Sequence, residues 1–138
     1  MATTTATLTL TSTDLLTDSL SLSATQTLYK AGTTTGLDSI QYESLEVPTG
    51  DVYVLLDATS AGANKANKVY IANKHTDATK YVDIYIASLC IGRLYAGDWA
   101  FFPLEAAAAT QDVGIEAISA AQVVEFALIH EGKTLVAS

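Results

Sequence analysis

The residues of this chain that could do chemistry are few and lie far apart in the sequence. The only histidines are His75 and His130, and Cys90 is the single cysteine. His75 stands near Asp77 in a polar stretch, which is typical of a solvated turn, and His130 follows an apolar run, where we expect it at a strand end. Neither histidine has the closely spaced Cys, His or carboxylate partners that a zinc site needs. The sequence therefore predicts no bound metal.

The sequence gives no stronger support for nucleophilic catalysis or for catalysis by a pair of carboxylates. Cys90 lies between Leu89 and Ile91, which predicts a buried, inert thiol without a base beside it. Carboxylate pairs serve glycosidases and Asp-rich loops bind calcium, but no D-x-D-x-D-G pattern occurs here. The carboxylates that mark polar faces or turns are Asp38, Glu43, Glu46, Asp51, Asp57 and Asp83. We predict a protein without catalytic residues or a cofactor.

The elements that carry these residues have the alternation of β-strands. Between residues 82 and 86 every second residue is aliphatic, and the residues between them are polar or aromatic. A strand with one buried and one wet face requires this pattern. Related runs occur at residues 51–57, 69–74, 99–104, 113–118 and 122–130. Strands spaced by about 10–14 residues, without helices long enough for parallel crossovers, predict an all-β antiparallel sandwich or jelly roll.

One expected strand changes phase along its length. Ile40 and Tyr42 share one parity, whereas Leu45 and Val47 fall on the other. If all four side chains face a common core, an extra residue must be inserted between the two pairs. The sequence therefore predicts a β-bulge near residues 43–44.

The N-terminal residues differ in composition from the rest of the chain. Residues 1–36 are rich in Thr and Ser and nearly free of charge, with leucines alternating among them. Such a segment is too poor in large apolar residues to fold alone. We expect an extended N-terminal arm that adds to another surface, or the first strands of the domain, with the sandwich body over residues 37–138. The candidate contacts of the arm are Leu8, Leu10, Leu15 and Leu16.

A group of lysines offers a second candidate contact. Lys65, Lys68, Lys74 and Lys80 flank an expected hairpin return at residues 74–79. One interpretation is protection of an edge strand, because lysines discourage edge-to-edge aggregation. The other is a positive patch that docks on an acidic partner.

Aromatic residues gather at the strand that begins with Trp99. In a strand, Trp99 and Phe101 share one face and Phe102 takes the other. The favoured interpretation is that they belong to the core. The alternative is that an aromatic side chain left on the surface anchors an interface.

Composition limits the class of partner. The chain has 138 residues, 49% of them hydrophobic and 16% charged, with a formal net charge of −8. One domain with a sizeable core is expected. An acidic surface disfavours nucleic acid and anionic membranes as partners, and one cysteine permits no internal disulfide. The N-terminal residues have neither the basic nor the apolar region of a signal peptide.

Several stretches resemble the small virion structural proteins of tailed bacteriophages, notably those of cyanobacterial phages. The stretches that carry the resemblance are residues 6–18, 30–33, 69–73, 91–103 (IGRLYAGDWAFFP) and 123–129. The resemblance implies a capsid decoration, or cement, protein of jelly-roll type. It implies a homotrimer that binds the major capsid protein on the head surface of a virion assembled in the host cytoplasm. The alternative is a tail- or fibre-associated adhesion module that binds host glycans.

Overall fold

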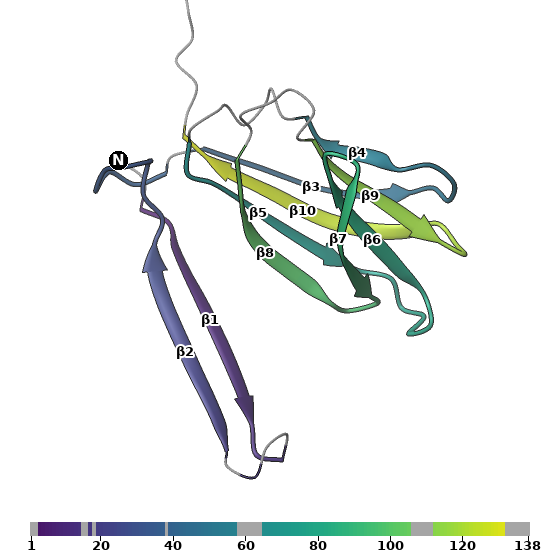
Figure 1. Ribbon diagram of the computed structural model, residues 1–138, viewed down its shortest axis with the longest axis horizontal. Helices are drawn as coiled ribbons and strands as arrows, with labels where there is room; N and C mark the ends of the chain where they lie inside the picture. The colour runs from purple at the N-terminus through teal and green to yellow at the C-terminus, as the bar shows by residue number, and fades with distance from the viewer. Residues whose placement is uncertain are drawn as a thin grey trace, which may run out of the picture.

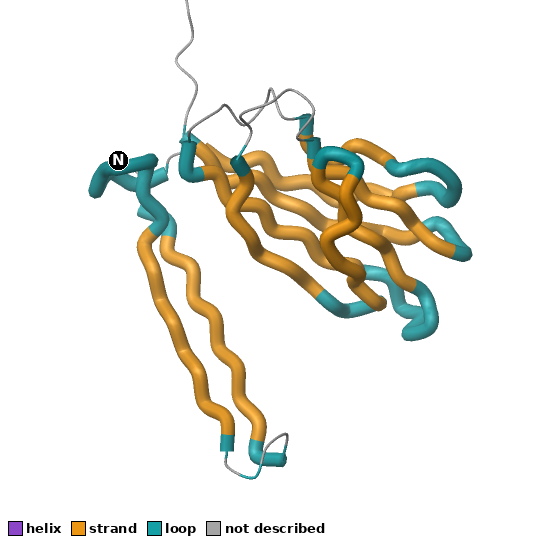
Figure 2. The backbone as a smooth tube through the Cα atoms, viewed as in Figure 1, coloured by secondary structure: helices purple, strands orange, loops and turns teal. Residues whose placement is uncertain are grey.

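The computed structural model of the chain contains strands and turns, and no helix in the residues that it describes (Figure 2). These residues are 3–14, 17, 19–37, 39–57, 65–105 and 112–131. The strands are β1 (Thr5–Ser12), β2 (Leu20–Thr27), β3 (Ser39–Val47), β4 (Tyr53–Leu56), β5 (Asn67–Asn73), β6 (Tyr81–Ile86), β7 (Leu89–Tyr95), β8 (Trp99–Leu104), β9 (Val113–Ile118) and β10 (Gln122–His130). All the strand pairs among them are antiparallel. The predicted all-β sandwich is confirmed.

Strands β3 to β10 form two sheets that pack face to face (Figure 1). The first sheet has the order β3-β10-β5-β8, and the second has the order β4-β9-β6-β7. Each strand of the first half pairs with its counterpart in the second half, β3 with β10, β4 with β9, β5 with β8 and β6 with β7. The chain is thus one long antiparallel ribbon wound into two layers. Residues 74–79 cross from one sheet to the other, so the expected hairpin return there is wrong.

The core fills the space between the two sheets. The inward parity of each central strand is aliphatic and almost fully covered, as at Val69 and Ile71 in β5 and at Val82 and Ile84 in β6. Burial of each such side chain stabilises the fold by roughly 1.5–3 kcal/mol. The other members of this core are Val47, Leu56, Leu94, Leu104, Val113, Ile115, Ala117, Val124, Phe126 and Leu128.

Two buried amides lock one end of the sandwich. Asn73 at the end of β5 and Gln122 at the start of β10 are both 0% exposed. The Asn73 Nδ2 group donates to Gln122 Oε1 at 3.0 Å and to the Leu94 carbonyl of the opposite sheet at 3.0 Å. The Gln122 Nε2 group donates to the Tyr81 carbonyl, also in the opposite sheet, at 2.7 Å. These bonds fix the two sheets relative to each other.

The N-terminal segment forms a sheet of its own. Strands β1 and β2 pair from Thr5↔Thr27 to Ser12↔Leu20 and project away from the sandwich (Figure 1). In the described part of the chain they pair with no strand of the two larger sheets. The arm is therefore a hairpin folded back on itself. Its strands of 8 residues reach about 27 Å, at about 3.4 Å per residue.

The expected bulge in β3 is wrong. The β3–β10 register runs without a shift from Ser39↔His130 to Val47↔Gln122. Leu45 and Val47 face the core, so Ile40 and Tyr42 point to the outer face, where they are 61% and 57% exposed. The change of phase in the sequence marks a change in which face is apolar.

The expectation that Cys90 is buried is also wrong. Strand β7 lies at the edge of its sheet, and a register shift against β6 falls beside Tyr85, the partner of Cys90. The Cys90 thiol is exposed, as are its neighbours Leu89 and Ile91. Apolar neighbours in the sequence did not imply burial, because an edge strand has a neighbouring strand on only one of its two sides.

The amide lock yields a stability prediction. Replacing Gln122→Ala removes an acceptor from the buried Asn73 amide and donors from several carbonyls. Because unpaired buried polar groups are costly, we expect a loss of about 2–4 kcal/mol in the free energy of unfolding. Urea denaturation measures it. The exposed control Gln26→Ala should cost less than about 0.5 kcal/mol, and equal losses for the two variants would contradict the proposed lock.

Candidate interaction surface

The outer faces of the two sheets differ in how well their side chains satisfy one another. On the second sheet, the Arg93 Nε group lies 3.0 Å from Asp83 Oδ1, and its guanidinium carbon lies 3.8 Å from the centre of the Tyr81 ring. The Tyr85 hydroxyl lies 3.1 Å from Glu116 Oε2. The hydrogen bond to Asp83 raises the pKa of Arg93. These two groups of polar contacts occupy part of this face, while Val54 and Tyr95 on its edge strands are 50% and 41% exposed.

The first sheet instead presents aromatic and aliphatic side chains to the outside. One row crosses all four strands, from Tyr42 through Ala127 and Tyr70 to Phe101. Trp99 lies in the next row, opposite Ala72. The aromatic face, as we call it, consists of Ile40, Tyr42, Tyr70, Trp99, Phe101 and Ile129.

Several of these side chains are exposed to a degree unusual for their size. Trp99 is 53% exposed and Phe101 is 39% exposed, while Phe102 on the opposite parity packs against the core. The favoured expectation that these aromatics belong to the core alone is therefore wrong for Trp99 and Phe101, and the alternative, that an aromatic side chain left on the surface anchors an interface, stays a prediction. Contiguous apolar surface of this kind marks a site of interaction.

One carboxylate lies among the rings of the aromatic face. Glu125 lies opposite Ala72 and Ser44, on the same side of β10 as Ala127. Its hydrogen bond with the Tyr42 hydroxyl raises the pKa of Tyr42. Burial, followed by the charge of Glu125, raises the pKa of Tyr70. Both tyrosines therefore stay neutral at physiological pH, which keeps the face weakly charged.

The β1–β2 hairpin has one apolar and one hydroxylated side. Its register places Leu8 opposite Ala24 and Leu10 opposite Leu22. The leucine face, as we call it, consists of Ala6, Leu8, Leu10, Leu20, Leu22 and Ala24. The other side carries only Thr and Ser, and the Thr7 and Thr25 hydroxyls lie 3.1 Å apart there. Leu8, Leu10 and Leu22 are 38%, 46% and 42% exposed.

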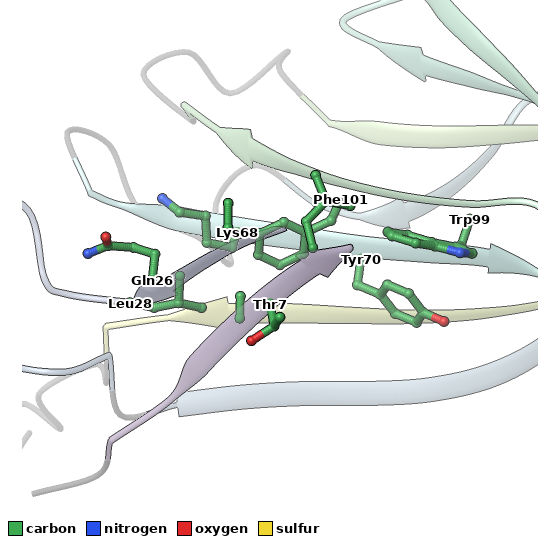
Figure 3. Close-up of a pocket in the computed structure, with 10 residues that line it drawn as sticks. Thr7, Gln26, Leu28, Lys68, Tyr70, Trp99 and Phe101 are labelled. Atoms are coloured by element: carbon green, nitrogen blue, oxygen red, sulfur yellow. The ribbon is translucent and has the colours of Figure 1, made fainter. Parts of the chain in front are cut away.

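A cleft of about 500 Å³ separates this hairpin from the sandwich. Ala6, Leu8 and Ala24 line one wall, and Tyr70 and Phe101 contribute to the other. Figure 3 shows Tyr70, Trp99 and Phe101 on the sheet side of this cleft, with Thr7 on the neighbouring strand. The two apolar surfaces of the chain thus border a common space that the chain itself leaves unfilled.

The base of the hairpin is held to the sandwich by buried leucines and one carboxylate. Leu28 and Leu37 are 4% and 1% exposed, and the Leu37 amide donates to the Leu28 carbonyl at 2.8 Å. Glu131 Oε1 accepts from the Ala31 amide at 2.8 Å, and Glu131 Oε2 lies 3.1 Å from Lys65 Nζ. The hairpin is therefore anchored at one end and open along its length.

The balance of forces on Glu131 lowers its pKa. Burial alone would raise it, but the hydrogen bonds from the Ala31 amide and Lys65 outweigh burial. The charged carboxylate is thus the form that holds the base of the hairpin.

The structure brings together part of the surface predicted from the sequence. Leu8, Leu10 and Trp99 line one hollow, and Lys68 lines the adjoining cleft. Leu15 and Leu16 lie outside the described residues.

The lysines do not form one patch. Lys65 and Lys74 lie beyond opposite ends of β5 and are separated by its length. Strand β5 lies between β10 and β8, so protection of an edge strand cannot explain Lys68, and that interpretation is wrong. Lys65 is paired with Glu131, whereas Lys74 borders a shallow hollow beside His75 and Trp99.

The two histidines make hydrogen-bonding contacts with residues close to them in the sequence. The His75 amide donates to Asn73 Oδ1 at 3.0 Å. His130 is 7% exposed, and its Nδ1 atom lies 2.7 Å from the Glu131 carbonyl oxygen. Within the described ranges, no group of three or more His, Cys, Asp or Glu residues could hold a metal ion.

Among the residues that the structure describes, no helix has the length and apolar character needed to cross a membrane.

Sequence reasoning missed Ile40, Tyr42 and Tyr70 as surface residues. The signal was present for the first two, because they are out of phase with Leu45 and Val47 in an unbroken strand. Tyr70 alternates with Val69 and Ile71, which is compatible with an outward side chain but does not reveal its neighbours. Those neighbours come from cross-strand pairing.

Comparisons with protein-family models, with curated proteins and with solved structures found no match to this chain.

The Glu131 contact predicts a pH dependence for the base of the hairpin. A carboxylate whose pKa is lower when folded contributes stability above its unfolded pKa, near 4.5, and loses it as the pH falls through the folded value. We expect the Ala31 amide to exchange with solvent faster as the pH falls below about 4.5, after correction for intrinsic exchange. Hydrogen exchange followed by NMR measures this.

Glu131→Gln should remove most of that pH dependence, because the amide side chain does not titrate in this range. Glu46→Gln, at an exposed position of β3, is the matched control and should leave the profile of Ala31 unchanged. A profile that is the same in Glu131→Gln as in the unaltered chain would contradict the assignment.

Proposed function

We propose that this chain is a non-enzymatic virion structural protein that decorates and stabilises the shell of a tailed phage, bound to the major capsid protein. The observation that carries the proposal is the pair of unpartnered apolar surfaces, the aromatic face and the leucine face. The first lies on the sandwich, and the second lies on the hairpin that projects from it. A protein that acts by contact needs such a surface, and an enzyme needs a cleft with convergent polar groups.

The wound order of the strands supports the same role. We propose that the ribbon, with β3 paired to β10 and β4 to β9, is wound as a jelly roll, a fold common in capsid and lectin domains. The fold alone does not define a function. The jelly roll agrees with the sequence of residues 91–103, which resembles phage virion proteins. It also agrees with a core that needs no disulfide in a reducing host cytoplasm.

Decoration also fits the chemistry of the arm. Residues 5–12 and 20–27 contain no charged residue, so the hairpin can approach an acidic or a basic shell without a charge penalty. Many copies on one lattice gain affinity by avidity even when each contact is weak. We propose that the arm provides the shell contact.

An adhesion module that binds glycans is the second candidate. Trp99 is 53% exposed and borders a shallow hollow with Asn73, Lys74 and His75. An exposed indole beside hydrogen-bonding side chains can stack on a pyranose ring. This arrangement favours the glycan hypothesis over other tail functions.

Removal of residues 1–27 tests the arm. We expect the truncated chain to lose binding to shells that have not yet been decorated, because the arm is gone, while Leu28 and the sandwich core remain in place. Co-sedimentation with shells measures binding, and circular dichroism with thermal unfolding measures the fold. As a control, Leu89→Ser on the edge strand β7, at a residue that is 68% exposed, should bind normally. Normal decoration by the truncated chain would overturn the proposal.

Copy number separates the two candidates. A decoration protein should occur in purified virions at a number comparable to that of the major capsid protein, as measured by quantitative mass spectrometry. A number tied to the symmetry of the tail, with glycan binding that Trp99→Ala abolishes, would favour adhesion instead.

A further inference from the structure

The β1–β2 hairpin presents a problem of stability. A two-stranded sheet is at best marginally stable in water, and a hydrophobic face must be covered before it persists. Here Leu8, Leu10 and Leu22 are 38–46% exposed, and the sandwich covers the hairpin only at its base. Some surface must complete this small sheet.

The same chain carries a surface of matching chemistry. The aromatic face extends across the whole first sheet, from Tyr42 on β3 to Phe101 on β8. The chain's own hairpin borders only the β5–β8 side, because Tyr70, Trp99 and Phe101 line the cleft whereas Ile40 and Tyr42 do not. The β3 side of the face is left 57–61% exposed at Tyr42 and Ile40.

We infer that a second copy of this chain covers both surfaces, with the leucine face of each hairpin lying across the aromatic face of the neighbouring copy. In a dimer, the hairpin of each copy covers the sheet of the other. In a closed ring, the hairpin of each copy covers the sheet of the next copy. The inference concerns self-association and goes beyond the proposed binding to a shell, for which it leaves the Thr and Ser side of the hairpin open.

The area is sufficient for such an assembly. A hairpin about 27 Å long and about 10 Å wide covers about 270 Å² of the surface beneath it. Each copy gives one hairpin and receives one, so it buries about 540 Å², and a pair buries about 1,080 Å² in total. A specific interface needs about 1,000 Å².

Charge also favours a second copy as the occupant. The chain carries a net charge of −8, so two copies repel one another wherever charged surfaces meet. The strands of the hairpin carry no charged residue, and the leucine face is the part of the chain that can approach an acidic neighbour without this penalty. The aromatic face receives it with neutral tyrosines, one flanking lysine, Lys68, and one carboxylate, Glu125, which is hydrogen-bonded to Tyr42 and meets no like charge on the hairpin strands.

Disulfide trapping between two different full-length variants tests the inference. One variant carries Leu10→Cys and Cys90→Ser, and the other carries Tyr42→Cys and Cys90→Ser. Mixed under mild oxidation, the two should form a crosslinked heterodimer on a non-reducing gel, because the hairpin of one reaches the β3 side of the other. Each variant oxidised alone should crosslink to a much smaller extent.

The mass of the uncrosslinked chain provides the second measurement. We expect a dimer or closed ring in sedimentation, and Leu8→Asp with Leu10→Asp should raise its dissociation constant at least tenfold. The control Thr9→Asp lies on the opposite side of the same strand and should have a smaller effect than the double leucine variant. Thermal unfolding should show the sandwich intact in both.

Three results would overturn the inference. The first is a monomeric chain with no crosslink in the mixture, and the second is an oligomer without that crosslink, which would place the interface elsewhere. The third is an efficient disulfide within one molecule that carries Leu10→Cys, Tyr42→Cys and Cys90→Ser, since the hairpin would then close on its own sheet. An unaltered chain that self-associates but does not bind shells would count against the proposed function alone.

Discussion

The strict alternation of side chains along each strand is the constraint on which this structure depends. Two sheets bury their inner faces against each other, and the Asn73–Gln122 amide pair fixes one sheet relative to the other. The outer faces are then settled as well, because every side chain that is not inward must point outward. One outer face carries the Arg93–Asp83 ion pair, and the other is mainly aromatic and aliphatic. The unequal faces follow from this alternation.

The sequence sufficed for the fold class because period-two patterns are local. The runs around Val82 and Val124 identify strands whatever lies next to them, and the absence of helical periodicity excludes α/β folds. The pairing of distant strands is not local, and so the crossing at residues 74–79 was misassigned as a hairpin. The prediction that Cys90 is buried failed for the same reason, because the neighbouring residues in the sequence do not reveal that a strand lies at the edge of its sheet.

The candidate surface was predictable in part. Leu8 and Leu10 were predicted as contacts, and Trp99 only as the alternative to a core position, because large apolar residues in weak or aromatic-rich contexts suggest contact. Ile40 and Tyr42 were missed because their change of phase has two explanations, a bulge or an outward apolar pair, and only the register with β10 distinguishes them. The joining of hairpin and sheet at one cleft depends on tertiary geometry, which no local pattern encodes.

A cryo-electron microscopy reconstruction of the virion or other native assembly that contains this chain tests the central claim most directly. The claim is that the chain works by contact through the aromatic face and the leucine face. The account predicts protein density packed against Trp99, Tyr42 and the leucines of the hairpin. It would be contradicted if these side chains face solvent while the assembly is held through the Arg93 side of the sandwich.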